Sequence, residues 1–403
     1  MKRYCLSFLS ITLGMLMACS SKNPNAYYVD ENALRYDHKA KLQYVDDIAF
    51  EADKSTTSAM SGTGYFTDKK TGKAYVTFLS PATKSIMIYD VDTKKCIRKI
   101  SVSDDGPNNT GPMTTPAMHK LLSLDSVLYF NFDNLYLLNS EGSILKKFSV
   151  VDPKGKADQP KPNPGTYAPI FVNGSYAYLI CSYNAEFKQQ SGLLDLIKIN
   201  LETGEKSEHF NRSTVYDNGF WGYNLNLYFL YGTFNPKTNE IVLGYAAEPF
   251  VHSYSLKNDT QQRRKFVGSE HFKAVNPFLD DRNDFKRNID PQTMAKSAEH
   301  EISNPSYYAL FFDEVSQTYI RVAFMPKSKT EYHDPVKRNK FKCTFILFDR
   351  DFNKIGENIL PDASVLDFRM MYIADGALHI FNKQKYNKDN DRLYFDRYKL
   401  LFN

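Results

Sequence analysis

Cysteine, tryptophan and long apolar runs are scarce in this chain of 403 residues. It holds five cysteines and one tryptophan, and only residues 6–18 form a sustained apolar run, which is shorter than the roughly 18 residues of a membrane span. No CxxC pair and no Cys–His spacing suited to zinc occurs, so we predict no metal site. Cys96, Cys181 and Cys343 each lie in a strand-like stretch, and we interpret them as core-filling thiols, with one disulfide as the alternative.

An excess of one charge, helical periodicity and catalytic signatures are also missing. Lys and Arg total 51 against 46 Asp and Glu, a net charge of +5, and loss of Lys2 and Arg3 would leave 49 against 46, or +3. This balance is too weak to indicate a nucleic-acid partner. GxSxG, HExxH, phosphate-loop and dinucleotide signatures are absent, so we expect no cofactor. The 42% apolar content nevertheless provides for a large core, which excludes a disordered chain.

The N-terminus has the pattern of an export signal. Lys2 and Arg3 precede the apolar run at 6–18, as in a secretory signal peptide. The run ends in Leu16-Met17-Ala18-Cys19, which resembles a bacterial lipobox. That resemblance implies cleavage before Cys19 and acylation of the Cys19 thiol and amino group, and several acyl chains give stable anchoring. The alternative is a simple secretory peptide with a chance cysteine.

These features predict three parts: a signal peptide at 1–18, a lipidated Cys19 with a polar tether at 19–35, and one folded domain at 36–403. The residue directly after Cys19 is Ser20 rather than an Asp. By resemblance to lipoprotein sorting, this favours the outer membrane. The tether leaves open whether the domain faces the periplasm or the exterior.

The folded part repeats a short motif in which an apolar run ends in a polar residue and a turn. Six copies follow one another at intervals of 49, 61, 55, 94 and 50 residues. The copies lie at 88–90, 137–139, 198–200, 253–255, 347–349 and 397–399. Asp, Asn and Gly follow most copies and are typical of hairpin turns. A second hairpin precedes each copy, so each unit reads as four antiparallel strands.

Six four-stranded units predict a single all-β, six-bladed β-propeller. The 94-residue interval holds an insertion at about 268–304, in which Asp290 before Pro291 predicts a capped helix. The last unit lacks a fourth strand, and the strand at 41–48 is available to complete it and close the ring. Seven blades, or a pair of β-sandwiches, are the alternatives.

With its lipobox, polar tether and six degenerate blades, the chain resembles the β-propeller lipoproteins of unknown function found in the envelopes of Gram-negative gut bacteria. The residues that carry the resemblance are 16–19 and the six strand-then-turn copies. The resemblance implies a propeller in the cell envelope. It implies no catalytic residue, since its motifs are architectural.

The long loops are expected on one face of the ring. In a four-stranded blade, the link between strands 2 and 3 and the link to the next blade emerge at the same end. All the long segments fall on those positions: 103–118, 151–168, 184–192, 211–223, 268–304, 326–342 and 382–392. Long loops on a rigid scaffold are where binding sites are usually built. The alternative is drift in loop length without a ligand.

Two groups of candidate binding residues lie in these loops. Lys327 and Arg338 belong to a basic loop and Lys383 to the next one, so their charges would converge to attract an anionic polymer, lipid headgroups or an acidic partner; the alternative is a solvated surface. Trp221 has Asn218 and Tyr223 nearby, and such a pattern favours sugar stacking with polar anchors. The alternative for Trp221 is packing between blades.

Three functions remain open. The leading hypothesis is a non-catalytic, lipid-anchored propeller that binds a ligand, such as a glycan, or an envelope protein on its loop-rich face. The alternative is a polysaccharide-acting enzyme whose carboxylates, such as Glu248 and Asp281, converge at the channel mouth ~5–10 Å apart. The third is a purely structural envelope protein with a plugged channel.

Overall fold

The computed structural model describes residues 36–403 apart from short gaps at 53–54, 114–115, 153, 156–158, 184–189, 191, 218, 224–225, 273 and 287–288. The predictions for the signal peptide, Cys19 and the tether, and the prediction for Asn218, lie outside the described residues.

Six antiparallel sheets form the described part of the molecule, and in five of them the strands follow chain order from the inner to the outer strand, whereas the sixth takes its outer strand from the N-terminal part of the domain. The first three are β2 (Ser61–Thr67), β3 (Ala74–Ser80), β4 (Ser85–Asp90) and β5 (Cys96–Ser101); β6 (Ala117–Ser123), β7 (Ser126–Asn131), β8 (Asn134–Asn139) and β9 (Ile144–Ser149); and β10 (Lys161–Pro162) with β11 (Phe171–Asn173), β12 (Tyr176–Ser182), β13 (Leu194–Asn200) and β14 (Lys206–Asn211).

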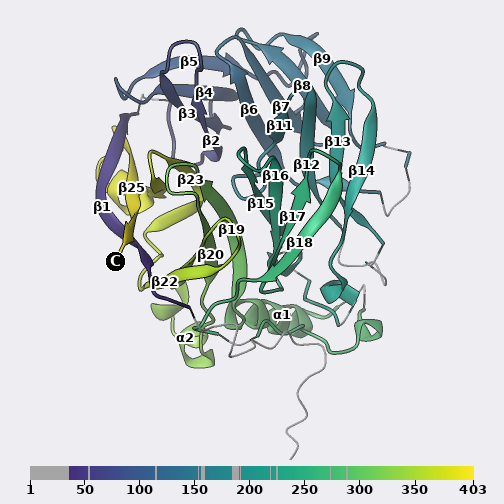
Figure 1. The fold of residues 1–403 in the computed structure, drawn as a ribbon, viewed down its shortest axis with the longest axis vertical. Helices are drawn as coiled ribbons and strands as arrows, with labels where there is room; N and C mark the ends of the chain where they lie inside the picture. The colour runs from purple at the N-terminus through teal and green to yellow at the C-terminus, as the bar shows by residue number, and fades with distance from the viewer. Residues whose placement is uncertain are drawn as a thin grey trace, which may run out of the picture.

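The remaining sheets are β15 (Leu230–Asn235), β16 (Glu240–Tyr245), β17 (Phe250–Ser255) and β18 (Thr260–Phe266); β19 (Ser306–Asp313), β20 (Thr318–Phe324), β21 (Cys343–Phe348) and β22 (Lys354–Leu360); and β23 (Leu366–Ala374), β24 (Ala377–Asn382), β25 (Arg392–Phe402) and β1 (Ala40–Glu51). We number these sheets blades 1 to 6. The described residues therefore form a six-bladed propeller, as predicted, and not seven blades or two sandwiches (Figure 1).

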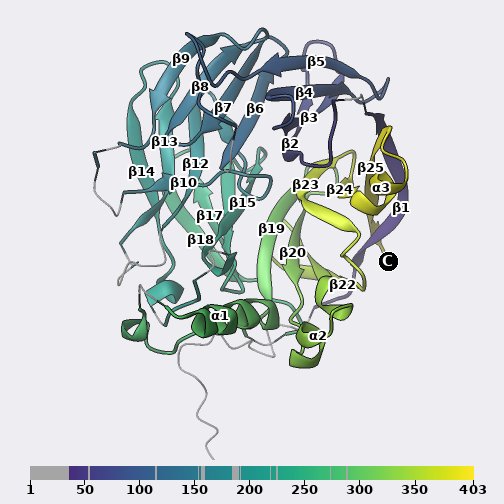
Figure 2. The ribbon, with the colours of Figure 1, turned by 180° about the vertical axis from the view of Figure 1, so that it is seen from behind.

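The N-terminal strand closes the ring. β1 pairs antiparallel with β25, from Ala40 opposite Phe402 to Glu51 opposite Arg392, with a bulge between Tyr44 and Asp46. The two strands lie side by side at the rim, β1 in purple and β25 in yellow (Figures 1 and 2). The first and last parts of the domain thus share one blade, which confirms the predicted role of the strand at 41–48 and ties both ends of the chain into one sheet.

Burial rises and falls with strand position in each blade. Middle strands such as β4 and β21 are buried along their whole length, whereas the outer strand β18 is almost entirely exposed. This explains why the middle strands read as unbroken apolar runs and the outer strands as polar ones. Cys181 and Cys343 are buried thiols and Cys96 is half-buried against the core, as expected for core-filling side chains.

The turns between the third and fourth strands use the predicted chemistry. In blade 1, the Asp90 carboxylate accepts hydrogen bonds from the backbone N–H groups of Asp92 (3.0 Å) and Thr93 (2.7 Å). Gly142 occupies the corresponding turn of blade 2 with φ +85°, and a Cβ there would lie 2.0 Å from the Ser101 carbonyl oxygen. Only glycine fits that approach between neighbouring blades.

The three α-helices of the described residues lie at the end of the strands from which the long loops emerge. α1 (Pro291–Ser303) lies in the link between blades 4 and 5, α2 (Lys329–His333) between β20 and β21, and α3 (Lys383–Lys388) between β24 and β25. Short 3-10 turns complete the loops: η2 (Thr214–Asp217), η3 (Asn226–Tyr228), η4 (Arg282–Asp284) and η5 (Lys337–Asn339). In both views α1 and α2 lie together along one side of the molecule (Figures 1 and 2).

α1 begins as predicted, with Asp290 accepting a hydrogen bond from the Thr293 N–H (2.8 Å) and Pro291 at its first position. Among the described residues, no helix has both the length and the apolar character needed to cross a bilayer.

Candidate functional site

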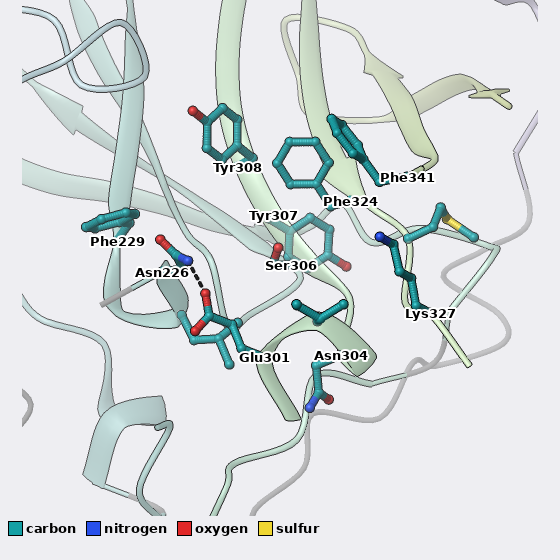
Figure 3. A pocket seen from close by; sticks show the side chains of 13 residues that line it. Asn226, Phe229, Glu301, Asn304, Ser306, Tyr307, Tyr308, Phe324, Lys327 and Phe341 are labelled. Atoms are coloured by element: carbon teal, nitrogen blue, oxygen red, sulfur yellow. Dashed lines mark hydrogen bonds between the residues drawn. The ribbon is translucent and has the colours of Figure 1, made fainter. Parts of the chain in front are cut away.

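A pocket of about 310 Å³ opens on the loop-rich face between blades 4 and 5. We call it the aromatic pocket, because four of its lining side chains are Phe229, Tyr308, Phe324 and Phe341 (Figure 3). The other lining residues are Asn226, Leu227, Glu301, Ile302, Asn304, Ser306, Tyr307, Met325 and Lys327. Its volume lies at the lower end of the range of small-molecule sites, and its walls are mainly apolar.

Rigid elements hold the aromatic walls. Tyr308 and Phe324 lie on the paired strands β19 and β20, near the ends from which the long loops leave, and their ring centroids are 4.9 Å apart. Phe341 follows α2 and packs edge-on against Phe324 at 5.5 Å. The walls are thus continuous with the core of blade 5, so the pocket is largely formed before any ligand arrives.

Polar groups occupy two opposite sides of the pocket. On one side the Asn226 amide donates a hydrogen bond to the Glu301 carboxylate, which lies near the end of α1. On the other side the Lys327 ammonium donates to the backbone carbonyl of Arg338. Figure 3 shows Glu301 and Lys327 on opposite sides of the apolar walls. Burial lowers the pKa of Lys327, and its neighbour Glu331 opposes that change.

A second pocket, of about 300 Å³, adjoins the first. We call it the lysine pocket, because its lining includes four lysines together with Glu331 and Asp362: Lys327, Lys337, Lys340 and Lys342. The two pockets share Met325, Lys327 and Phe341. The predicted basic loop at 326–342 therefore folds back against an apolar pocket.

Trp221 does not form the expected sugar platform. Its side chain is 1% exposed, and its ring N–H donates to the Val215 carbonyl at 3.3 Å. It packs edge-on against Tyr216 in the core of blades 3 and 4. The packing alternative is therefore the correct interpretation, because a ring with no free face cannot stack on a ligand.

The other expected binding residues are dispersed. Tyr223 is half-buried, and its hydroxyl donates to the Lys286 carbonyl at 3.0 Å. Arg338 is exposed and contributes its carbonyl to Lys327. Lys383 is half-buried at the start of α3, on the neighbouring blade. Of the candidates in described positions, only Lys327 lines a pocket named above.

Glu248 is buried rather than open at a channel mouth. Its carboxylate is 0% exposed, accepts from the Ser213 hydroxyl at 2.8 Å and lies 2.5 Å from His252 Nε2. Arg264 lies 3.6 Å from it. Asp281 is exposed and accepts from the Asn283 N–H at 2.8 Å, which caps η4. The expected use of Glu248 as a channel-mouth acid is therefore wrong, because its side chain has no free access to a polymer.

A second buried polar cluster lies beside Glu248. The Arg212 guanidinium donates to Asp195 at 2.7 Å and to Gln190 at 2.7 Å, and the Asp195 and Arg212 side chains are both 0% exposed. The Tyr245 hydroxyl donates to the second Asp195 oxygen at 2.6 Å. Burial raises the pKa of Asp195, while the charge of Arg212 and the hydrogen bond from Tyr245 oppose that rise. These contacts join β12–β14 to β16 and explain the cluster as a structural link between blades 3 and 4.

The centre of the ring is occupied by the chain itself. Between β10 and β11 the chain leaves blade 3, and the Thr166 hydroxyl oxygen accepts from the Thr63 N–H (3.3 Å) while donating to the Arg369 carbonyl. The Tyr167 carbonyl accepts from the Gly232 N–H at 3.0 Å. Thr166 and Tyr167 thereby contact β2, β23 and β15, and a hollow of only about 170 Å³ lies beside them.

Within the part of the chain that the structure describes, one group of residues has the donor types for a metal ion. Glu270, His271 and Glu357 bring their oxygen and nitrogen atoms within 4.8 Å of one another. Glu357 is already engaged, because it accepts from Ser269 (2.5 Å) and lies in an ion pair with Lys354. A metal would have to displace that ammonium, so this group does not suit a cation.

The aromatic pocket was missed because its walls come from distant parts of the chain. Phe229 precedes β15, Tyr308 and Phe324 lie on neighbouring strands, and Phe341 lies beyond α2. The sequence does contain a pattern that indicates this pocket, since these aromatic residues lie where strands meet the long loops. The prediction for the loop at 326–342 rested on its charge alone.

Fold and site together define a closed six-bladed propeller that carries a ligand-sized apolar pocket on its loop-rich face. The chain belongs to the DUF4221 family, described as a domain of unknown function, whose model matches residues 39–359.

Two of the solved structures that resemble this chain share its fold over almost its full length. A member of the DUF4221 family from Bacteroides vulgatus ATCC 8482 aligns with a TM-score of 0.71 at 20% identity, covering 91% of this chain and 99% of that one. A protein from Bacteroides fragilis NCTC 9343 aligns with a TM-score of 0.51 at 10% identity, covering 94% and 98%. Both similarities concern the fold. No curated protein sequence matches the chain.

Proposed function

We propose that this protein is a non-catalytic, lipid-anchored propeller of the cell envelope that binds a ligand on its loop-rich face. The aromatic pocket carries the proposal. It is of ligand size, is lined by rings held on strands, and has a charged group on each of two sides. Two carboxylates considered for a hydrolytic alternative, Glu248 and Asp281, are engaged in local contacts, which leaves that alternative without support.

Blocking the pocket tests its use. Ile302 lines the pocket from α1 and is 38% exposed, so Ile302→Trp adds bulk at the pocket with little cost in packing. Met294 lies on the same helix, is 45% exposed and is not among the lining residues, so Met294→Trp is the matched control.

The measurement is a thermal-shift screen of neutral, cationic and anionic aromatic compounds and of neutral and acidic oligosaccharides. A compound that binds the native state raises the melting temperature with its concentration. We expect at least one compound to do so with the parent protein and Met294→Trp, and to lose its effect with Ile302→Trp. Equal shifts in both variants, or no shift in the whole panel, would count against the pocket as a ligand site.

The anchor requires a separate test. Radiolabelled palmitate should enter the protein in a Gram-negative host, and Cys19→Ser should abolish the label and release the protein from the membrane fraction. Label that persists in Cys19→Ser would refute the proposed anchor. Protease treatment of intact cells would then show which side of the outer membrane the propeller faces.

A further inference from the structure

The shared wall of the two pockets points to the chemistry of the ligand. We propose that the pair binds a small amphipathic anion, with its apolar ring in the aromatic pocket and a phosphate, sulfate or carboxylate group toward the lysine pocket. This inference rests on the proposed function of the same face and adds the ligand class. Met325, Lys327 and Phe341 belong to both linings, so one molecule can contact both pockets.

Lys327 stands at the junction and has no direct ion-pair partner among the described residues, although the Glu331 carboxylate acts on it at longer range. It is half-buried, its ammonium donates to the Arg338 carbonyl, and it forms no ion pair within 4.0 Å in the described part of the chain. A partly desolvated ammonium whose hydrogen-bond acceptor is neutral is costly, and burial lowers its pKa, while the charge of Glu331 only partly opposes that change. An anionic group placed beside it would regain the lost electrostatic stabilisation.

Two further cations line the lysine pocket without a direct hydrogen bond or ion pair, although Lys342 acts on Glu331 and Lys340 on Asp362 through their charges at longer range. Lys340 and Lys342 are exposed, and across the described residues their ammonium groups form no hydrogen bond or ion pair. They differ from Lys337, which lies 3.8 Å from Asp334, and from Lys329, which lies 3.8 Å from Glu299. Three lysines of this pocket are thus available to an incoming anion.

The carboxylates of the two pockets are each held by local donors. Glu331 accepts from the Ser328 N–H (2.9 Å) and hydroxyl (2.8 Å) in the capping box of α2. Asp362 accepts from the Ser364 N–H (3.1 Å) and from its hydroxyl. Glu301 is bonded to Asn226 on the side of the aromatic pocket away from Lys327 (Figure 3). This arrangement orients a ligand, since its anionic end is favoured at Lys327 and disfavoured at Glu301.

Three compounds with one ring system test the charge preference. Isothermal titration calorimetry of the purified protein would compare 1-naphthyl phosphate, neutral 1-naphthol and cationic 1-naphthylmethylamine. We expect the phosphate to bind about tenfold more tightly than the naphthol, as expected for one charge-assisted hydrogen bond, and the amine to bind most weakly. The preference for phosphate should fall as salt is raised.

Lysine variants locate the anionic end. Lys327→Met keeps an unbranched apolar side chain but removes the charge, so the affinities for 1-naphthyl phosphate and 1-naphthol should become equal within about twofold. Lys329→Met is the matched control, because Lys329 lies in the same loop, is directed toward Glu299 and lines neither pocket. It should leave the tenfold preference intact.

The outcomes separate this inference from the proposed function. Binding of all three compounds without a charge preference, abolished by Ile302→Trp, would retain the pocket as a ligand site and refute the amphipathic anion. Equal weakening of phosphate binding by Lys327→Met and Lys329→Met would refute the amphipathic anion as well. Failure of all three compounds to bind would also refute the inference, while the wider thermal-shift panel would decide the proposed function independently.

Discussion

The Arg212 cluster and the Lys327 junction belong to the same end of the propeller, but they treat a positive charge in opposite ways. Arg212 is completely buried and has Asp195 and Gln190 as partners, with the Tyr216 ring 4.5 Å from its guanidinium carbon. Lys327 is half-buried, and its ammonium donates a hydrogen bond to the backbone carbonyl of Arg338. A buried charge paired with a carboxylate serves to join blades, whereas a charge whose hydrogen-bond acceptor is neutral, beside an apolar pocket, is suited to a ligand.

The largest expected effect follows from breaking the Arg212 cluster. Arg212→Met leaves the Asp195 carboxylate buried without its counter-ion, so we expect a loss of about 3–5 kcal/mol in the free energy of unfolding. Chemical denaturation would measure it. Arg212→Met combined with Asp195→Leu removes both charges and should recover most of the loss. A single variant within about 1 kcal/mol of the parent would show that the ion pair does not link these blades.

Truncating the central segment should come next. The Tyr167 ring stacks on Phe229 at 5.4 Å and lies 5.8 Å from Tyr308. Tyr167→Ala removes these contacts at the centre of the ring, and we expect a loss of about 2–4 kcal/mol, measured by denaturant unfolding. The exposed Tyr176→Ala, at 37% exposure on β12, is the control and should cost about 1 kcal/mol or less. Equal losses would mean that the central segment contributes no special packing.

Acid should destabilise the protein through two buried histidines whose burial outweighs any neighbouring negative charge. Burial lowers the pKa of His119 to about 3 and that of His379 to about 4. Because the unfolded chain takes up protons below about pH 6.5 and these folded side chains do not, stability present above pH 6.5 falls as the pH falls toward 4.

At pH 5 each histidine should cost about 2 kcal/mol relative to pH 7. Unfolding free energies at the two pH values would measure the difference, and His379→Gln should reduce it by that amount. His333→Gln, whose side chain is 67% exposed, is the control and should leave the difference unchanged. A pH response that is the same in all three proteins would exclude His379 as a cause.

The smallest expected effect is at the junction itself. Lys327→Met removes a charge that has no ion-pair partner among the described residues, so the free energy of unfolding should change by no more than about 0.5 kcal/mol. Thermal unfolding measures it. A loss comparable with that of Arg212→Met would show that Lys327 is structural, and the contrast between the two regions would disappear.

The repeat and the ring closure could be derived from local patterns. Strands alternate or run apolar over a few residues, and turns such as Asp90–Asp92–Thr93 satisfy their own backbone donors. The unpaired last unit ending at Phe402 and the spare strand near the N-terminus implied one shared blade, because an open edge is disfavoured. The turns depend on residues that are neighbours in the sequence, and the ring closure follows from the number of strands in each unit.

The predictions of binding residues were less successful than those of the fold. Trp221 and Glu248 read as loop residues, yet both are buried, because the loop around Trp221 packs on blades 3 and 4 and the Glu248 carboxylate collects donors from Ser213 and His252. Lys327 was predicted for its charge alone. Its apolar surroundings come from Phe229, Tyr308 and Phe341, which the ring brings together from three separate segments.

Local patterns along the chain were enough to predict the all-β architecture, the number of blades, the closing strand and the end at which long loops gather, because these follow from short-range periodicity and turn chemistry. The folded structure was needed to show which loop side chains are buried, that Thr166 and Tyr167 occupy the centre, and that an aromatic pocket meets a lysine pocket at Lys327. Burial and pocket shape depend on contacts between residues far apart in the chain, and a single sequence does not specify those contacts locally.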